Sequence, residues 1–353
     1  MKEMVIYNII ALLIIGTSIL GIMKVKKGFI SVFYIVFMIS ICLLGCNDQT
    51  MPDYSQQPQN TEKVKKLDHS KEMGSISYGI INEDGIVETN EVYLLKKGES
   101  FERFINIENY LGYDCQFALT IFVNYIQSDF RLDGKQTHLG EVTVLNEKEL
   151  FMPIELNELK EGYNDIIFLI IPSPSNSKRT AELRFQAIEP LYLRCTILVG
   201  DDYDYDYDEV IVPTINSTEV LFEKGEDSGI YIRDEMQDFQ QYQIIELQKN
   251  DQLNFDIILD DSNLTWDKGM EKGECVVILL RNLEQVNLFG KNFLYTTTKP
   301  NMKTVIPYEE RQRKEGYYEY LAIKINGPYE IIDSYDVSGN ISFSGFTGVN
   351  VIE

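Results

Sequence analysis

A run of acidic and aromatic residues offers the most unusual set of metal ligands in this chain. Residues 201–209 read Asp-Asp-Tyr-Asp-Tyr-Asp-Tyr-Asp-Glu, and in an extended segment the alternation places Asp on one side and Tyr on the other. Because Ca²⁺ binds about six to eight oxygens, Asp202, Asp204, Asp206 and Asp208 are candidate ligands. Asp is depleted in strands, and the run does not have the Gly and the terminal Glu at the offsets of a calcium-binding loop, so the pattern favours a solvated, self-repelling hinge. A second acidic group has the same limitation: Asp260, Asp261, Ser262, Asn263 and Asp267.

Residues that could perform catalysis are sparse. The chain has two histidines, His69 and His138, and it contains no G-x-S-x-G sequence that would present a serine nucleophile. It also has no C-x-x-C spacing and no glycine-rich phosphate loop. A hydrolase needs only a pair of carboxylates, but the 55 acidic residues give no basis for choosing one pair. The sequence therefore predicts a non-enzymatic protein without a cofactor. Ca²⁺ is the candidate ion for its acidic run.

Three cysteines lie in the part of the chain with strand-like patterning, namely Cys115, Cys195 and Cys275. A thiol at the head of an apolar strand usually serves as a small core residue. In an oxidising compartment, Cys115 and Cys195 are candidates for a disulfide, although an odd number of cysteines leaves at least one unpaired. The pattern favours buried free thiols over that disulfide.

Residues 1–46 have the composition of a membrane-targeting segment. Two apolar runs, residues 4–23 and 28–45, are each close to the roughly 20 residues that cross a bilayer as a helix. The basic residues between the runs should remain cytoplasmic, and they are Lys24, Lys26 and Lys27. Everything after the second run is then expected outside the cytoplasm.

The second run ends in Leu43-Leu44-Gly45-Cys46, which resembles a bacterial lipobox. The resemblance implies that the Cys46 thiol receives diacylglycerol and that the protein is a lipoprotein anchored at the extracytoplasmic face of the cell membrane. Read from Met23, the charged, apolar and small-residue regions match a compact signal peptide, which predicts that translation begins there. The alternative is a membrane anchor of two helices, beginning near residue 4.

The net charge of the whole chain constrains the partners, and the composition just after Cys46 constrains the local structure. With 32 basic and 55 acidic residues the net charge is −23, which argues against nucleic acid as a partner. Residues 47–74 contain few apolar residues and are predicted to form a flexible tether, because they cannot bury enough surface to fold.

The remaining chain has the pattern of an all-β protein. Short runs rich in Ile, Val, Phe and Tyr, separated by Gly, Asn, Asp and Lys, extend over residues 75–200 and again over 210–353. Regular short strands without helical periodicity predict two tandem immunoglobulin-like β-sandwich domains, joined by the acidic hinge at 201–209.

Landmarks shared by the two halves predict a tandem duplication. Leu95–Phe101 matches Leu247–Leu253 at an offset of 152, and Cys115 matches Cys275 at an offset of 160. Two further pairs share an offset of 154, Pro153 with Pro307 and Gly162 with Gly316. The Gly162-Tyr163 pair resembles the immunoglobulin corner at which a tyrosine hydroxyl holds a loop.

These observations favour a non-catalytic binding or adhesion module at the cell surface. Tandem sandwiches present sites on loops, and a tether would let the module reach its partner. The expected partners are membrane lipid, through Cys46 or the N-terminal helices, and an unidentified envelope protein or cell-wall polymer. An assembly or scaffold role in an envelope complex is the alternative, and a carboxylate-based hydrolase has less support.

Overall fold

The computed structural model describes residues 51–52, 54–59, 74–88, 92–173, 189–200, 221–224, 228–233, 244–261, 273–311, 314–332 and 341–353. Within these ranges the chain forms the strands β1 to β22 and no helix, so the prediction of an all-β fold is confirmed. None of the described residues belongs to a helix long and apolar enough to cross a membrane. The two apolar runs before Cys46 lie outside the described residues.

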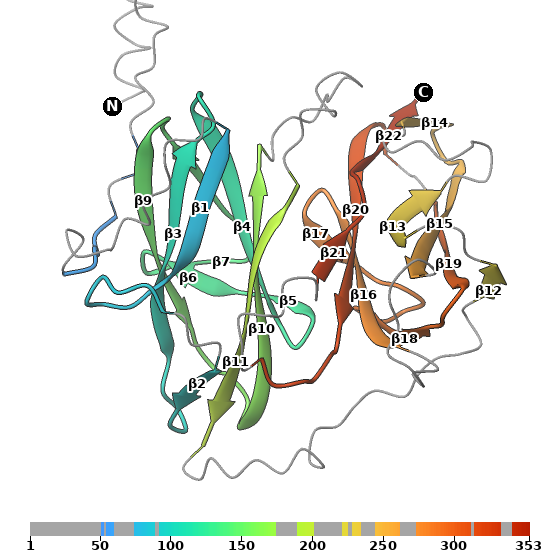
Figure 1. Cartoon of the computed structure of the whole chain (residues 1–353). Coiled ribbons are helices and arrows are strands. Elements are labelled where there is room, and N and C mark those ends of the chain that lie inside the picture. Colours follow the sequence, from blue (N-terminus) through green and yellow to red (C-terminus); the bar gives the residue numbers. More distant parts are fainter. Residues whose placement is uncertain are drawn as a thin grey trace, which may run out of the picture. The chain divides into compact units, whose positions relative to one another are not determined.

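The first sandwich consists of two sheets (Figure 1). Its outer sheet has the strand order β1 (Ser75–Ile81), β3 (Phe101–Tyr110), β9 (Lys148–Leu156), β6 (Phe130–Leu132) and β7 (Lys135–Thr137). Its inner sheet has the order β2 (Val92–Leu95), β11 (Leu191–Val199), β10 (Gly162–Pro172), β4 (Cys115–Val123) and β5 (Ile126–Ser128), with β8 (Gly140–Val144) also paired to β4.

The second sandwich repeats this arrangement. Its outer sheet has the order β12 (Leu221–Lys224), β19 (Met302–Arg311), β15 (Gln252–Asp261) and β13 (Ser228–Arg233). Its inner sheet has the order β14 (Ile244–Gln248), β22 (Thr347–Ile352), β20 (Gly316–Asn326), β16 (Gly273–Arg281) and β17 (Glu284–Val286), with β18 (Leu294–Thr298) paired to β16 and β21 (Ile341–Phe343) paired to β20.

Strand register shows that the two sandwiches have the same internal connections. Gly162 pairs with Val199 in the first sandwich, and Gly316 pairs with Val351 in the second. Both inner sheets also contain one parallel pair, β2 with β11 and β14 with β22. Gly162 and Gly316 therefore occupy equivalent positions, as the shared offset of 154 predicts.

The predicted equivalence of Cys115 and Cys275 is wrong by two residues. Phe117 pairs with Pro172, and Cys275 pairs with Asn326. Since the offset of 154 makes Pro172 equivalent to Asn326, Cys275 is equivalent to Phe117. A shift of two residues preserves the side of the strand, which is why both cysteines still face their own sandwich core.

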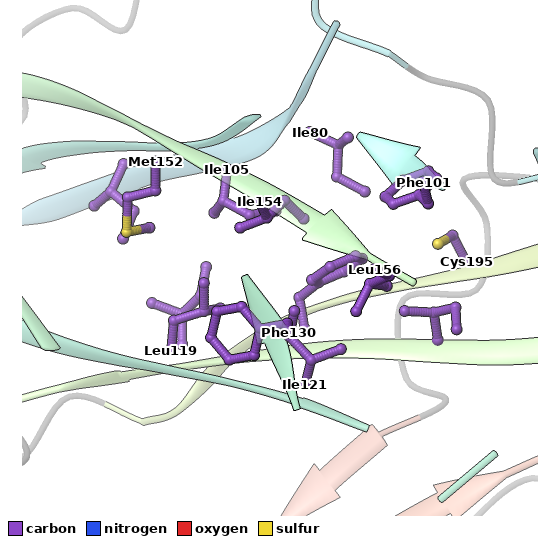
Figure 2. Close-up of a cluster of buried hydrophobic side chains, with 14 of the residues drawn as sticks. Ile80, Phe101, Ile105, Leu119, Ile121, Phe130, Met152, Ile154, Leu156 and Cys195 are labelled. Carbon is purple, nitrogen blue, oxygen red and sulfur yellow. The ribbon is translucent and has the colours of Figure 1, made fainter. Parts of the chain in front are cut away.

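Each sandwich has its own apolar core between its two sheets. In the first, Ile105 and Met152 of the outer sheet point toward Leu119 of the inner sheet (Figure 2). Outer strands alternate as expected for a half-buried sheet, since Leu253 and Phe255 are buried whereas Asn254 between them is exposed.

The inner sheets bury both faces. A third buried cluster joins residues of β4 and β10 to residues of β16 and β20, and it includes Phe122, Leu169, Ile278 and Ile323. This explains the unbroken apolar runs in β10 and β16, because a strand covered on both faces gains from an apolar residue at every position. The two sandwiches are therefore packed together through their inner sheets.

The described part of residues 51–59 contacts the first sandwich. Ser55 is bonded to Asp133, and the amide of Gln59 donates to the carbonyl of Glu83 at 2.8 Å. Met51 and Tyr54 pack against the first core. This stretch of the predicted tether is thus held on the sandwich, and we call it the strap.

Candidate functional site

The predicted lipidation and metal residues are not described by the structure. Cys46 and the four aspartates 202, 204, 206 and 208 lie outside the described ranges, so their roles stay predictions. Among the described residues no three His, Cys, Asp or Glu side chains gather in a way that would hold a metal ion. In the second acidic group, Asp261 is buried and accepts from Lys324 Nζ at 2.6 Å, so it is engaged in an ion pair.

The three described cysteines are buried and form no disulfide with one another, which confirms the prediction of buried thiols. Burial raises the pKa of Cys275 to about 12. It also raises the pKa of Cys115, although contacts with Ser173 act in the opposite direction. Because the thiolate is the reactive form, these cysteines are suited to packing rather than to nucleophilic chemistry.

A buried acid–base network lies where the two sandwiches meet. Asp165, in β10, accepts from Arg194 Nη2 at 2.7 Å and from Arg194 Nε at 3.1 Å. The hydroxyl of Tyr125 donates to the same carboxylate at 2.6 Å. The Asp165 and Arg194 side chains are 0% and 3% exposed. Burial alone would lower the pKa of Arg194, but the adjacent carboxylate raises it further above its usual value, so the guanidinium stays charged.

This network also binds a segment of the second sandwich. Arg194 donates from Nη1 to the carbonyl of Asn326 and from Nη2 to the carbonyl of Gly327, both at 2.9 Å. Tyr163 donates its hydroxyl to the carbonyl of Glu330 at 2.9 Å. The first sandwich therefore holds the backbone that follows β20, and these hydrogen bonds satisfy main-chain groups at the interface.

Two glutamines join the sandwiches by a reciprocal exchange of hydrogen bonds. The backbone amide of Gln127 donates to Gln285 Oε1 at 2.7 Å, and the backbone amide of Gln285 donates to Gln127 Oε1 at 2.8 Å. Gln127 Nε2 then donates to the carbonyl of Leu283, and Gln285 Nε2 donates to that of Tyr125. Such mutual contacts between equivalent residues are the pattern of a two-fold interface, which here lies within one chain.

The turns that carry these glutamines are also equivalent. Asn124-Tyr125 links β4 to β5, Asn282-Leu283 links β16 to β17, and all four residues have positive φ between 50° and 68°. Positive φ at both positions is typical of a type I′ hairpin, but it is strained for Tyr and Leu. Their packing in the shared cluster offsets that strain.

The expected tyrosine corner differs in detail from the prediction. The Tyr163 hydroxyl reaches the second sandwich instead of holding its own loop. The loop is held by the next residue, because Asn164 Nδ2 donates to the carbonyl of Lys160 at 2.8 Å. In the second sandwich the position equivalent to Asn164 is Tyr318, and its hydroxyl donates to the carbonyl of Lys314 at 3.1 Å.

A groove lies on the outer sheet of the first sandwich, next to the strap. It has a volume of about 160 Å³, and its lining includes one polar side chain and charged side chains of both signs: Gln56, Glu83, Glu102, Arg103, Arg131 and Glu155. Arg103 is held by Glu88 at 2.7 Å, and Arg131 lies 3.2 Å from Glu155. Since small-molecule pockets usually measure about 300–1,000 Å³, this groove has room for one side chain or one sugar unit of a larger partner.

Sequence reasoning missed the junction network, although a signal was present. Asp165 stands at the head of the apolar run 166–171, and Arg194 stands inside the apolar strand Leu191–Val199. Charged residues within runs that imply burial on both faces indicate a buried pair. The sequence alone does not show that Asp165 and Arg194 pair with each other. That pairing depends on the strand register, which places Arg194 opposite Ile167.

Pairing and sheet order define this as an all-β protein of two immunoglobulin-like sandwiches. No family model matches the sequence, and no curated protein sequence matches it. Among solved structures, a CARDB domain from Pyrococcus furiosus in complex with di-metal ions is 12% identical, with a TM-score of 0.24, over 42% of this chain and 100% of that domain. The ASH/PapD-like domain of human CEP192 is 12% identical, with a TM-score of 0.22, over 39% of this chain and 92% of that domain.

Red sea bream transglutaminase is 11% identical, with a TM-score of 0.21, over 79% of this chain, and the chain spans 31% of the transglutaminase.

Proposed function

We propose that this protein is an extracytoplasmic lipoprotein, anchored through Cys46, that binds a macromolecular partner without catalysis. The lipobox-like Leu43–Cys46 sequence supports the anchor. The β-sandwich body supports a binding role, because such bodies present grooves, edges and loops on a rigid frame.

The single observation that carries the non-catalytic proposal is the use made of the buried charges. Asp165 with Arg194, and Asp261 with Lys324, are each an opposite-charge pair with side chains at most 5% exposed. Each carboxylate is hydrogen bonded to its cationic partner, and Arg194 also holds backbone carbonyls. These groups hold strands together, which is the structural use of a buried ion pair.

The groove beside the strap supports a macromolecular partner. Its size suits one unit of a polymer or one side chain of a protein, and its carboxylates and guanidinium groups favour a polar unit. The remaining affinity would come from the surrounding surface, as is usual for an interface of roughly 800 Å² per partner.

The anchor is tested by the mass of the mature N-terminus in wild type and in Cys46→Ser. A diacylglyceryl group on Cys46, and release of Cys46→Ser from the membrane fraction, are the expected results. A chain that starts at Met1 with an unmodified thiol would leave the two-helix anchor in its place.

Binding is tested with residues 51–353 immobilised and exposed to cell-wall polymer and to envelope extract, with and without Ca²⁺. Arg131→Ala in the groove should weaken capture at least several-fold, whereas Lys249→Ala should not. The two cations are matched, because their side chains are 49% and 46% exposed and each pairs with a glutamate.

The identity of the captured material separates the two readings of this proposal. Retention by wall polymer supports adhesion, and one stoichiometric envelope protein supports assembly. Turnover of a glycan or peptide that one carboxylate substitution abolishes would overturn the non-catalytic proposal.

A further inference from the structure

We propose that the strap holds the first sandwich close to the bilayer, with its outer sheet toward the lipid headgroups and the second sandwich pointing outward. This inference rests on the proposed lipid anchor at Cys46. In place of a long flexible tether, the protein would have a short attachment and a preferred orientation. Because the groove lies on the same outer sheet, this orientation favours an envelope protein at the membrane over wall polymer as the partner of the groove.

The strap is attached at several points. Ser55 donates to Asp133 Oδ1 from its amide at 2.9 Å and also from its hydroxyl. The Gln59 amide is bonded to the carbonyl of Glu83 at 2.8 Å. Met51 and Tyr54 pack on the first core, and burial, together with Asp133, raises the pKa of Tyr54 to about 12. Polar and apolar contacts thus act together over a short stretch.

Chain length then limits the distance between the anchor and the sandwich. Five Cα–Cα steps separate Cys46 from Met51, which at about 3.6 Å each allows at most roughly 18 Å. A free tether over residues 47–74 would instead have a root-mean-square span of about 30 Å and would reach far beyond that when extended. The strap therefore removes most of the reach that composition alone predicts.

Both ends of residues 60–73 are also fixed on the first sandwich. Gln59 is bonded to Glu83, and the Gly74 amide donates to the carbonyl of Tyr110 at 2.8 Å. The connection between them starts and finishes on the same sandwich, so it adds nothing to the distance from the membrane.

The position of the strap determines which face of the first sandwich turns toward the membrane. Asp133 lies in the turn between β6 and β7 of the outer sheet, and Gln56 lines the groove on that sheet. Over residues 129–137 the cations Arg131 and Lys135 balance Asp129 and Asp133, in a chain of net charge −23. A hairpin without net charge is repelled less by anionic headgroups than the strongly acidic remainder of the chain.

The layer order predicts a measurable separation. The strap lies by the outer sheet of the first sandwich, and the outer sheet of the second sandwich is the fourth layer, because the inner sheets share a buried cluster. Packed sheets are about 10 Å apart, so the first and fourth layers are about 30 Å apart. Energy transfer to a membrane acceptor resolves a difference of this size.

The experiment uses the full lipidated chain in vesicles that contain a headgroup-linked acceptor dye. A donor is attached to Lys135→Cys or to Asn254→Cys, both exposed positions, in a Cys42→Ser background with the other cysteines buried or lipidated. Transfer from position 135 should be at least twice that from position 254. Asp133→Ala removes the Ser55 contacts and should lower transfer from position 135, whereas Asp84→Ala, an exposed aspartate on the same sandwich, should leave it unchanged.

The outcomes separate the two proposals. Equal transfer from positions 135 and 254 in anchored protein, or no effect of Asp133→Ala, would overturn the strap orientation and leave the lipid anchor intact. Protein that carries no lipid on Cys46 and leaves the membrane fraction would overturn both.

Discussion

Removal of the Arg194 side chain should destabilise the folded protein more than removal of any exposed charge. Arg194→Met keeps most of the aliphatic volume, but it deletes two bonds to Asp165 and the bonds to the carbonyls of Asn326 and Gly327. The Asp165 carboxylate would remain fully buried, with the hydroxyl of Tyr125 at 2.6 Å and that of Tyr163 at 3.4 Å as neutral donors in place of a cation. The substitution therefore leaves the Asp165 carboxylate without its cationic partner at the junction of the two sandwiches.

The expected loss follows from that geometry. Breaking a buried ion pair by removing one partner costs about 3–5 kcal/mol, because the other charge stays uncompensated in a dry site. The free energy of unfolding of a domain is only about 5–15 kcal/mol, so the variant should be close to its stability limit. An exposed pair should behave differently, and the Lys97–Glu161 pair, 68% and 61% exposed, should contribute no more than about 1 kcal/mol.

Urea unfolding of residues 51–353, followed by circular dichroism, measures the effect in five proteins. These are wild type, Arg194→Met, Asp165→Asn, the double variant and the exposed control Lys97→Met. The double variant should lose less than the sum of the two single losses, by about 2 kcal/mol or more, since it leaves no unpaired charge. An Arg194→Met loss below about 1 kcal/mol, or strict additivity, would refute the argument that this network holds the sandwiches together.

Three further predictions concern the junction and the buried thiols. Gln127→Ala and Gln285→Ala should each cost about 1–2 kcal/mol in urea unfolding and be less than additive together, whereas Gln136→Ala on the exposed β7 should cost less than about 0.5 kcal/mol. Burial raises the pKa of Cys275 from its ordinary value of 9 to about 12, so the thiol of the unfolded chain ionises first and stability is lost as pH rises from 9 to 12. The Cys275→Ala variant should lose less stability over this range, and an equal slope would contradict this cause. The thiols of Cys115, Cys195 and Cys275 should resist a thiol reagent until urea unfolds the chain, and labelling of the native protein would show that a core opens.

Strand patterning predicts much of this fold because one-sided burial leaves a period of two in the sequence. Outer strand β15 alternates exposed and buried residues at its start. The duplication is also visible, since Gly162 and Gly316 each begin the same strand with positive φ. Both features depend on residues that are close together in the sequence, so they can be predicted from the sequence alone.

The junction could not be predicted from the same patterns, because it depends on pairing between distant residues. The unbroken apolar run in β10 indicates burial of both faces, but it does not say which surface covers the second face. The strap escaped prediction for a related reason. Its composition is that of a flexible segment, and a few specific contacts, such as Ser55 with Asp133, hold it.

Departures from the internal two-fold symmetry indicate where the two repeats have acquired different roles. By register, Asp165 is equivalent to Glu319, and Arg194 is equivalent to position 346, which is Phe in the second sandwich. Only the first sandwich can therefore supply a guanidinium at this position. In that sandwich the guanidinium holds the backbone after β20, while Phe346 contributes apolar surface to the shared cluster. The interface thus retains equivalent turns and glutamines at its centre, but the ion pair beside them is present once, and its arginine belongs to the first sandwich.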